Sequence, residues 1–334
     1  MRIGIVNDIQ IAVEVLRRVV TSSSEHEIAW VAYDGAEAAE RCLADTPDVV
    51  LMDLIMPNVN GVEATRRIMR ASPCAILVVT ANVDHNAALV FDAMGQGALD
   101  AVNTPVLRHK SVEGGRELLA KLAMISKLLK PNAVAGASER RSLLRDGSAP
   151  PLVAIGASTG GPAALAVLLK ALPADFDAAI AIVQHVDAQF APGLGRWLER
   201  ETGRRVQIAE PGARLEHAAV QLAATNDHLV LRPDGTLGYV VEPSDYPYRP
   251  SVDVFFTSVV AHWRGAAIGV LLTGMGRDGA DGLLAMRRAG WPTIAQDQQS
   301  SVVYGMPKAA VDLGAAGQVL PIGRIGTAIA AAIL

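Results

Sequence analysis

The sequence contains few of the residues that mark a secreted or membrane-embedded protein. Only two of its 334 residues are cysteine, which excludes a disulfide framework, and we expect Cys42 and Cys74 to be small buried hydrophobes. No apolar run reaches the roughly 18 residues that a membrane-spanning helix needs. Asn7 and Asp8 interrupt the first apolar run, which argues against a signal peptide. We therefore expect a soluble, cytoplasmic protein without membrane insertion.

Aromatic residues and blocks of like charge are also scarce. Aromatic side chains make up 4% of the chain, and the net charge is -4 with no basic block. The lack of a basic block argues against nucleic acid as a partner. Hydrophobic residues, mostly Ala, Val, Leu and Ile, make up 51%, which suits helices packed on both faces of buried parallel strands. A length of 334 residues favours two domains.

Strand and helix patterns alternate along the chain and are interrupted once. Residues 1–125 contain five strand runs and five helical patterns, which predicts one doubly wound parallel α/β domain. A stretch rich in Gly, Ala, Ser, Pro and charge follows, and we interpret residues 126–151 as a linker. From residue 152 to residue 334 the alternation resumes, which predicts a second doubly wound parallel-sheet domain.

Three segments have a less regular pattern. We expect the last strand of the first domain over Ala98–Val102 and its last helix over Val112–Leu129. In the second domain, apolar stretches at 221–226 and 229–241 predict an antiparallel hairpin with Pro233-Asp234-Gly235 as its turn.

Polar side chains follow the predicted strands of the first domain. They are Asp8 after the first strand, Asp53 at the end of the third, Thr80 at the end of the fourth and Thr104 after the fifth. Because parallel strands end at the same edge of a sheet, we expect them to converge. Two nearby carboxylates form a hard-oxygen site that suits Mg²⁺, and a metal-bound aspartate can attack a phosphoryl group in line. The alternative is that Asp8 and Asp53 only cap turns and helices.

Four segments of the first domain match a known family. They are Ile5-Val-Asn-Asp8, Pro47-Asp-Val-Val-Leu-Met-Asp53-Leu-Ile-Met-Pro57, Gly61 and Gly97-Ala-Leu-Asp-Ala101. On these segments residues 1–125 resemble the receiver domain of bacterial response regulators. The resemblance implies that Asp53 accepts phosphate from a histidine kinase and that Asp8, Asp53 and the carbonyl of Ile55 bind Mg²⁺. It also implies that Thr80 contacts the phosphoryl group.

Two positions depart from the receiver pattern. Asn7 stands where receivers usually carry a second acid, and Thr104 stands where a lysine usually precedes the proline after the fifth strand. Asn7 removes one negative charge beside the metal, and Thr104 removes a cation that would face the phosphoryl oxygens. The departures point to weaker metal binding or weaker coupling of phosphate to conformational change.

Three predicted strands of the second domain each end in a polar group of possible catalytic use. The strand before Ser158 begins at Leu152, the strand before His185 begins at Ala178, and the strand before Asp278 begins at Ala266. The carboxyl ends of strands in an open parallel sheet line one crevice. Ser158, His185 and Asp278 are therefore expected to meet as nucleophile, base and orienting acid.

The local motifs leave alternatives open. Gly156-Ala-Ser158-Thr-Gly160 fits the pattern G-x-S-x-G of a nucleophile turn, but a glycine-rich turn after a strand is as often a phosphate cradle. Taken alone, Asp278 is compatible with a helix N-cap. Gly274-x-Gly276-x-x-Gly279 matches a dinucleotide fingerprint and so suggests an NAD oxidoreductase. Against this, Asp278 would place a carboxylate beside the pyrophosphate.

Five segments of the second domain match a second family in order. They are Ile155-Gly-Ala-Ser-Thr-Gly-Gly-Pro162, Val183-Gln-His185, Tyr248-Arg-Pro-Ser-Val-Asp253, Leu272-Thr-Gly-Met-Gly-Arg-Asp-Gly-Ala280 and Tyr304-Gly-Met-Pro-Lys308. On these segments residues 152–330 resemble the catalytic domain of the chemotaxis protein-glutamate methylesterases, the CheB family. The resemblance implies a triad of Ser158, His185 and Asp278, with the side chain of Thr159 and the backbone of Met275 near the oxyanion.

Together the two resemblances predict a phosphorylation-regulated hydrolase of a chemotaxis-like pathway. It would demethylate glutamate esters on methyl-accepting chemoreceptors, and would also deamidate receptor glutamines, with a CheA-type histidine kinase as its second partner. Mg²⁺ would serve the receiver domain, and the esterase reaction would need no cofactor. In three segments, Met1-Arg-Ile-Gly-Ile-Val-Asn-Asp8, Ser72-Pro-Cys-Ala-Ile-Leu77 and residues 95–105, the receiver sequence resembles the Wsp-type branch, in which the receptor array responds to surface growth and drives a diguanylate cyclase. The alternative is a catalytically silent response-regulator scaffold that binds kinase or receptor.

Overall fold

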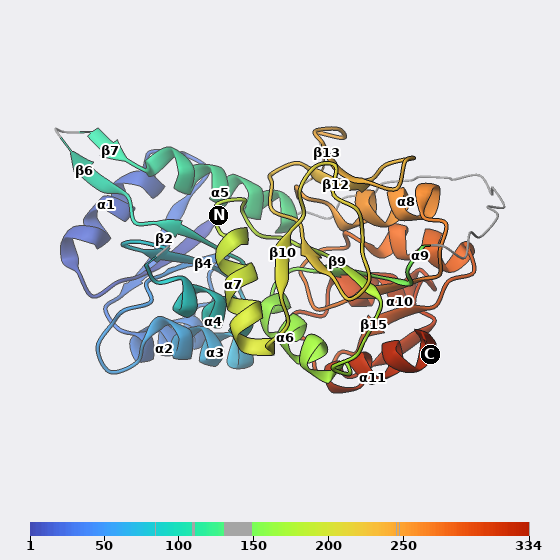
Figure 1. Ribbon diagram of the computed structural model, residues 1–334. Helices are drawn as coiled ribbons and strands as arrows, with labels where there is room; N and C mark the ends of the chain where they lie inside the picture. Colours follow the sequence, from blue (N-terminus) through green and yellow to red (C-terminus); the bar gives the residue numbers. More distant parts are fainter. Residues whose placement is uncertain (84, 109–110, 130–148, 245, 247, 334) are drawn as a thin grey trace. The chain divides into compact units, whose positions relative to one another are not determined.

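A computed structural model describes all residues except 84, 109–110, 130–148, 245, 247 and 334. The chain divides into two compact units, Met1–Pro131 and Asn132–Leu334, each with its own sheet and core (Figure 1). Of the linker proposed over 126–151, residues 126–129 belong to the last helix of the first unit, and 130–148 lie outside the described residues. No helix in the described part of the chain is both long and apolar enough to cross a membrane.

The first unit is built on a five-stranded parallel sheet with the order β2-β1-β3-β4-β5. Most strand residues are buried, because apolar side chains run continuously along strands that are covered on both faces. The order reverses beside β1, so the carboxyl ends of β1 and β3 border a crevice. The strands are β1 (Arg2–Val6), β2 (Glu27–Ala32), β3 (Val49–Met52), β4 (Ala75–Thr80) and β5 (Asp100–Asn103).

Helices cover both faces of this sheet. One layer pairs α1 with α5, and the other places α3 between α2 and α4. Asp34 and Asn60 start α2 and α3 by accepting hydrogen bonds from first-turn backbone N–H groups. The helices are α1 (Gln10–Thr21), α2 (Gly35–Ala44), α3 (Gly61–Ala71), α4 (Ala87–Gln96) and α5 (Gly115–Leu129).

The end of the first unit differs from the sequence prediction. The strands β6 (Val106–Arg108) and β7 (Ser111–Glu113) form an antiparallel pair, and β7 covers the first residues of the predicted last helix, so α5 begins only at Gly115. Gly114 has a φ of +83°, a left-handed conformation that separates β7 from α5. The predicted strand 98–102 is also displaced, because the left-handed Gly97 still ends α4 and pairing with β4 starts only at Asp100.

The second unit contains a seven-stranded parallel sheet with the order β10-β11-β9-β8-β14-β15-β16. The strand order reverses between β8 and β14, and open parallel sheets form their functional crevice at such a point. The predicted class of two doubly wound parallel sheets is therefore confirmed. The strands are β8 (Leu152–Ala157), β9 (Ala179–Gln184), β10 (Val206–Ile208), β11 (Val220–Leu222), β14 (Ala267–Leu271), β15 (Thr293–Gln296) and β16 (Gln318–Leu320).

Two helix layers again enclose the sheet. Helix α6 packs against α7 and α11, and α9 packs against α8 and α10. The buried aromatic residues Phe255 and Phe256 of α8 join the core of this unit. The helices are α6 (Gly161–Ala171), α7 (Ala191–Thr202), α8 (Val252–His262), α9 (Ala280–Arg288), α10 (Met306–Asp312) and α11 (Ile322–Ile333).

The predicted hairpin of the second unit is only partly correct. Strands β12 (His228–Leu231) and β13 (Leu237–Val240) are antiparallel, with Pro233-Asp234-Gly235 between them as expected. The stretch that begins at Gln221 does not belong to this hairpin. Its first two residues lie in β11, which pairs in parallel with β9 and β10. A run of three strand residues carries too little pattern to reveal which sheet it joins.

Candidate active site

Ser158 lies in the short turn between β8 and α6. Its backbone N–H donates to the carbonyl of Thr273 (3.0 Å), and its own carbonyl accepts from the N–H of Gly161 (2.7 Å). Gly160 has a φ of +77°, and a Cβ at Gly161 would lie 2.0 Å from Oε1 of Gln184. The turn therefore requires glycine, and it holds Ser158 at the start of α6, where backbone N–H groups favour negative charge.

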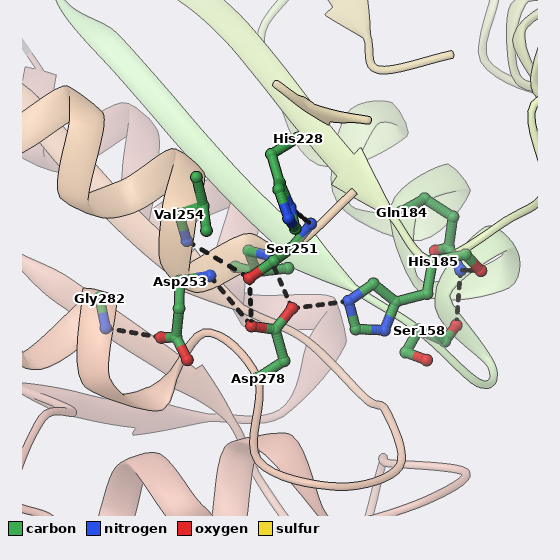
Figure 2. A network of polar contacts seen from close by, with 10 residues as sticks. Ser158, Gln184, His185, His228, Ser251, Asp253, Val254, Asp278 and Gly282 are labelled. Atoms are coloured by element: carbon green, nitrogen blue, oxygen red, sulfur yellow. Dashed lines mark hydrogen bonds and ion pairs between the residues drawn. The ribbon is translucent and has the colours of Figure 1, made fainter. Parts of the chain in front are cut away.

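His185 directly follows β9 and is fixed to the Ser158 turn through its backbone. Its N–H donates to the carbonyl of Ala157 (3.0 Å). The buried side chain of Gln184 donates through Nε2 to the carbonyls of Ser158 (2.8 Å) and His185 (3.1 Å). The two strand ends are thus tied together, and Figure 2 shows the side chain of Ser158 beside the imidazole.

Asp278 lies on the other side of the imidazole, in the loop before α9 (Figure 2). Its Oδ2 is 2.8 Å from Nε2 of His185 and also accepts from the N–H of Val252 (2.6 Å). Its Oδ1 accepts from Oγ of Ser251 (2.7 Å) and from the N–H of Asp253 (3.1 Å). Burial alone would raise the pKa of Asp278, but the hydrogen bond with His185 and the donors at the start of α8 hold it below its ordinary value.

The orientation of the His185 ring assigns its two nitrogens different tasks. An ionised Asp278 can only accept hydrogen bonds, so Nε2 carries the proton and Nδ1 carries the lone pair. Nδ1 is buried and has no hydrogen-bond partner among the described residues, so no hydrogen bond connects it to Ser158. In the usual serine hydrolase arrangement the acid binds Nδ1 and the serine faces Nε2. Here the two nitrogens exchange places, which sequence reasoning did not predict.

The segment from Tyr248 to Asp253 contributes more to the site than its sequence indicates. The ring of Tyr248 stacks on the imidazole of His185, with ring centroids 3.9 Å apart and planes 14° from parallel. Oδ1 of Asp253 accepts from the N–H of Gly282 in α9 (2.7 Å). Burial and the charge of Asp278 raise the pKa of Asp253 to about 8. The only sequence signal for these roles was the match of this segment to the family.

Thr159 and Met275, predicted near the oxyanion, lie on two loops that pack together beside Ser158. Oγ1 of Thr273 donates to the carbonyl of Thr159 (2.9 Å). A Cβ at Gly274, the residue before Met275, would lie 2.7 Å from Cβ of Ser158. Close packing thus explains why Gly274, the first glycine of the dinucleotide-like pattern, carries no side chain. The oxyanion role of Thr159 and Met275 stays a prediction.

The receiver site lies at the carboxyl ends of β1, β3 and β4 in the first unit. Asp53 directly follows β3 and is buried. Its carboxylate accepts from the amide Nδ2 of Asn7 (3.1 Å) and from the N–H of Leu54 (2.7 Å). Burial, with a smaller contribution from the charge of Asp8, raises the pKa of Asp53 to about 6. Oγ1 of Thr80, at the end of β4, accepts from the side chain of Asn86 (3.0 Å).

The donor set at this edge suits a hard divalent cation. The predicted ligands, the carboxylates of Asp8 and Asp53 and the backbone carbonyl of Ile55, would all supply oxygen atoms. The raised pKa of Asp53 shows a desolvated carboxylate that a cation would stabilise in its charged form. No cluster of three or more His, Cys, Asp or Glu side chains in the described part of the chain is placed to hold a metal.

Comparison with known proteins assigns both units to families. A family model described as CheB methylesterase matches residues 153–329, and a model described as response regulator receiver domain matches residues 3–113. The chain belongs to the CheB methylesterase family. The resemblance inferred from the sequence is therefore confirmed, and the chain combines a hydrolase domain of this family with a response-regulator receiver.

Close relatives of this CheB-family chain match along nearly their whole length. Protein-glutamate methylesterase/protein-glutamine glutaminase 4 of Burkholderia thailandensis is 57% identical over 326 residues, which cover 97% of this chain and 95% of that protein. Protein-glutamate methylesterase/protein-glutamine glutaminase 3 of Burkholderia orbicola is 56% identical, covering 100% of this chain and 98% of that protein. The crystal structure of the Thermotoga maritima CheB methylesterase catalytic domain is 31% identical with a TM-score of 0.52, covering 55% of this chain and 98% of that chain.

Proposed function

We propose that this protein is a protein-glutamate methylesterase that hydrolyses methyl esters of glutamate side chains on chemoreceptors, and a glutaminase that deamidates receptor glutamines. The observation that carries the proposal is the hydrogen bond between His185 and Asp278 (2.8 Å) beside Ser158. Relatives at 57% identity that bear both activities in their names support the choice of substrate.

The proposed reaction is acyl transfer through Ser158. Oγ of Ser158 bonds to the ester carbonyl carbon while its proton moves to Nδ1 of His185. The imidazolium keeps its Nε2–H on Asp278, whose lowered pKa keeps it ionised as the positive charge forms. Collapse of the tetrahedral intermediate breaks the C–O bond, and methanol leaves with the proton from Nδ1. Water then attacks the acyl-enzyme, gives its proton to Nδ1, and glutamate is released as the proton returns to Ser158.

Two further groups belong to the proposed chemistry. Thr159 and the backbone of Met275 would stabilise the oxyanion of the tetrahedral intermediate, because they border Ser158 at the start of α6. With a glutamine substrate the same steps expel ammonia in place of methanol. Both leaving groups take their proton from Nδ1, so one histidine serves both reactions.

The first unit supplies the proposed regulation. Asp53 would accept phosphate from a CheA-type histidine kinase, with Thr80 contacting the phosphoryl group. Asp8, Asp53 and the carbonyl of Ile55 would hold Mg²⁺, which neutralises phosphoryl charge when bound. Phosphorylation would relieve inhibition of the catalytic unit by the receiver, and Asn7 and Thr104 would make this effect smaller than in receivers with the usual residues.

The receiver segments that match the Wsp-type branch lead us to place the protein in a chemotaxis-like pathway, where demethylation would serve receptor adaptation. The enzyme would act in the cytoplasm on the methylated helices of the receptor.

The direct test is methanol release from methylated receptor by the Ser158→Ala variant. We expect a loss on the order of 10⁴-fold or more, because removal of the nucleophile leaves only binding and oxyanion stabilisation. The variant should keep the thermal unfolding profile of the parent chain. Ser24→Ala, which changes an exposed serine of the first unit, is the control and should leave the rate unchanged. Full activity in Ser158→Ala would exclude the proposed mechanism.

A further inference from the structure

The imidazole of His185 makes a contact that the triad chemistry does not require. One face of the ring is covered by Tyr248, with centroids 3.9 Å apart and planes 14° from parallel. Both residues are buried: Tyr248 is 6% exposed and His185 is 7% exposed. A buried stack this close to parallel fixes the plane of the imidazole, which a single hydrogen bond at Nε2 cannot do.

The same short segment also fixes the acid that His185 contacts. Ser251, Val252 and Asp253 donate three hydrogen bonds to the carboxylate of Asp278. The segment is itself anchored, because the N–H of Ser251 donates to Nδ1 of His228 (3.0 Å). Residues 248–253 therefore hold both partners of the His185–Asp278 pair, one by stacking and the other by hydrogen bonds.

The stack also affects the charge that His185 carries during the reaction. An aromatic face attracts a cation within about 6 Å of its centroid, most strongly where water is excluded. The imidazolium forms only after Nδ1 accepts the proton of Ser158, so a ring at 3.9 Å stabilises the intermediate more than the resting neutral histidine. This interaction would lower the barrier without contacting the substrate.

We propose that Tyr248 is a positioning residue of the esterase reaction: its ring holds the His185 imidazole with Nδ1 toward Ser158, and its aromatic face stabilises the imidazolium. The inference rests on the proposed function for its effect on rate, but its effect on the histidine is independent of any substrate.

Asp278 contacts the imidazole, and three further titratable groups are connected to Asp278 or to the segment that holds it. Asp278 and Asp281 come from the loop before α9 and its first turn, and Asp253 comes from the first turn of α8. His228 of β12 reaches the site through Ser251. None of these is altered by a substitution at Tyr248, so a shift in the titration of His185 can be assigned to the ring.

The experiment compares Tyr248→Phe with Tyr248→Leu in the full-length chain. The first readout is the NMR titration of His185, with resonances assigned by its absence in His185→Gln. In Tyr248→Leu we expect the midpoint to move to lower pH by roughly half a unit to one unit, because the imidazolium loses its aromatic partner. In Tyr248→Phe the ring is kept, so the midpoint should stay within about 0.2 units of the parent.

The second readout is the hydrolysis of methylated receptor across pH. Tyr248→Leu should lower kcat by roughly 10- to 100-fold with little change in KM. The acid limb of its pH–rate profile should shift together with the midpoint of the His185 titration measured by NMR. Tyr248→Phe should stay within about threefold of the parent chain. Pentafluorophenylalanine at position 248 covers the case in which Tyr248→Leu does not fold. It keeps the ring shape but reverses its charge distribution, and it should reproduce the downward shift.

Two results would overturn the inference. One is an unchanged His185 midpoint in both Tyr248→Leu and the fluorinated ring. The other is an equal loss of kcat in Tyr248→Phe and Tyr248→Leu, which would assign the effect to the hydroxyl. If instead the parent chain releases no methanol while the NMR shift is present, the proposed function fails and the role of Tyr248 toward His185 stands.

Discussion

Asp253 is a half-buried acid whose ionisation is not part of the proposed chemistry. Its side chain accepts from the N–H of Gly282 (2.7 Å), and its backbone N–H donates to Asp278. Burial and the charge of Asp278 raise its pKa from 3.8 to about 8. The folded protein thus keeps this proton up to about pH 8, whereas the unfolded chain loses it near pH 4. The contribution of Asp253 to stability is full below about pH 4 and is lost as the pH rises toward 8.

This pH dependence of stability predicts how the Asp253→Asn variant behaves. The amide keeps an acceptor for Gly282 but cannot ionise, so the variant should gain stability relative to the parent as the pH rises from 5 to 9. The measurement is the thermal unfolding midpoint at several pH values, followed by tryptophan fluorescence. The signal reports mainly the second unit, which holds three of the four tryptophans, Trp197, Trp263 and Trp291.

Asp281→Asn is the matched control for this prediction. It removes a half-exposed carboxylate from the first turn of the neighbouring helix α9, where solvent screens the charge. Its difference from the parent should change much less with pH. A pH-independent difference for Asp253→Asn would contradict the assignment of a proton-retaining Asp253.

Some residue roles were predictable from sequence and others were not. Ser158, His185 and Asp278 each follow a long apolar run, and parallel strands end at one edge, so their meeting could be predicted. The sequence could not predict which ring nitrogen of His185 binds Asp278, because this depends on the direction from which Asp278 approaches the imidazole. The stacking of Tyr248 on His185 could not be predicted either, because the sequence of a loop does not determine which aromatic rings come into contact.

The junction of β8 and α6 depends on the absence of a side chain at Gly161. A Cβ at Gly161 would lie 2.0 Å from Oε1 and 2.9 Å from Cδ of Gln184. Gln184 in turn holds the carbonyls of Ser158 and His185. A methyl group at Gly161 would therefore displace the side chain that ties the ends of β8 and β9 together.

We expect Gly161→Ala to lower both stability and activity. Overpacking against a fully buried side chain typically costs about 1–3 kcal/mol, and loss of the Gln184 contacts should reduce kcat by roughly 10- to 100-fold. The measurements are chemical denaturation and methanol release. Gly323→Ala in α11 is the control, because nothing lies within 4 Å of its Cβ position, and it should be neutral or slightly stabilising. Equal effects of the two substitutions would contradict this account.

At the scale of elements, long buried strands were easier to predict than short ones. β8, β9 and β14 have continuous apolar runs of five or six residues, and their positions were anticipated. β11 and the pair β6–β7 have three residues per strand, and their pairing depends on contacts made elsewhere in the fold. The start of α5 was misplaced for the same reason, because Gly114 interrupts a pattern that otherwise continues.

At the scale of the whole molecule, the chain joins two units that each have a complete core and a complete candidate site. The core of the first unit lies between β1–β5 and helices α1 and α5, and that of the second includes α8 and α9. Asp53 belongs to one unit, and Ser158, His185 and Asp278 belong to the other. Any control of the esterase by phosphate must therefore pass from one unit to the other, and a change of charge at Asp53 is the only input that this account requires.

The most direct test of the account measures the initial rate of methanol release from methylated receptor by the full-length chain. The rate is recorded with Mg²⁺, with and without a small acyl phosphate as phosphodonor, and compared with Asp53→Ala. We expect the phosphodonor to raise the rate of the parent several-fold and to leave Asp53→Ala unchanged, with Ser158→Ala inactive throughout. A parent rate that does not respond to the phosphodonor, or a response that persists in Asp53→Ala, would contradict a phosphorylation-regulated methylesterase.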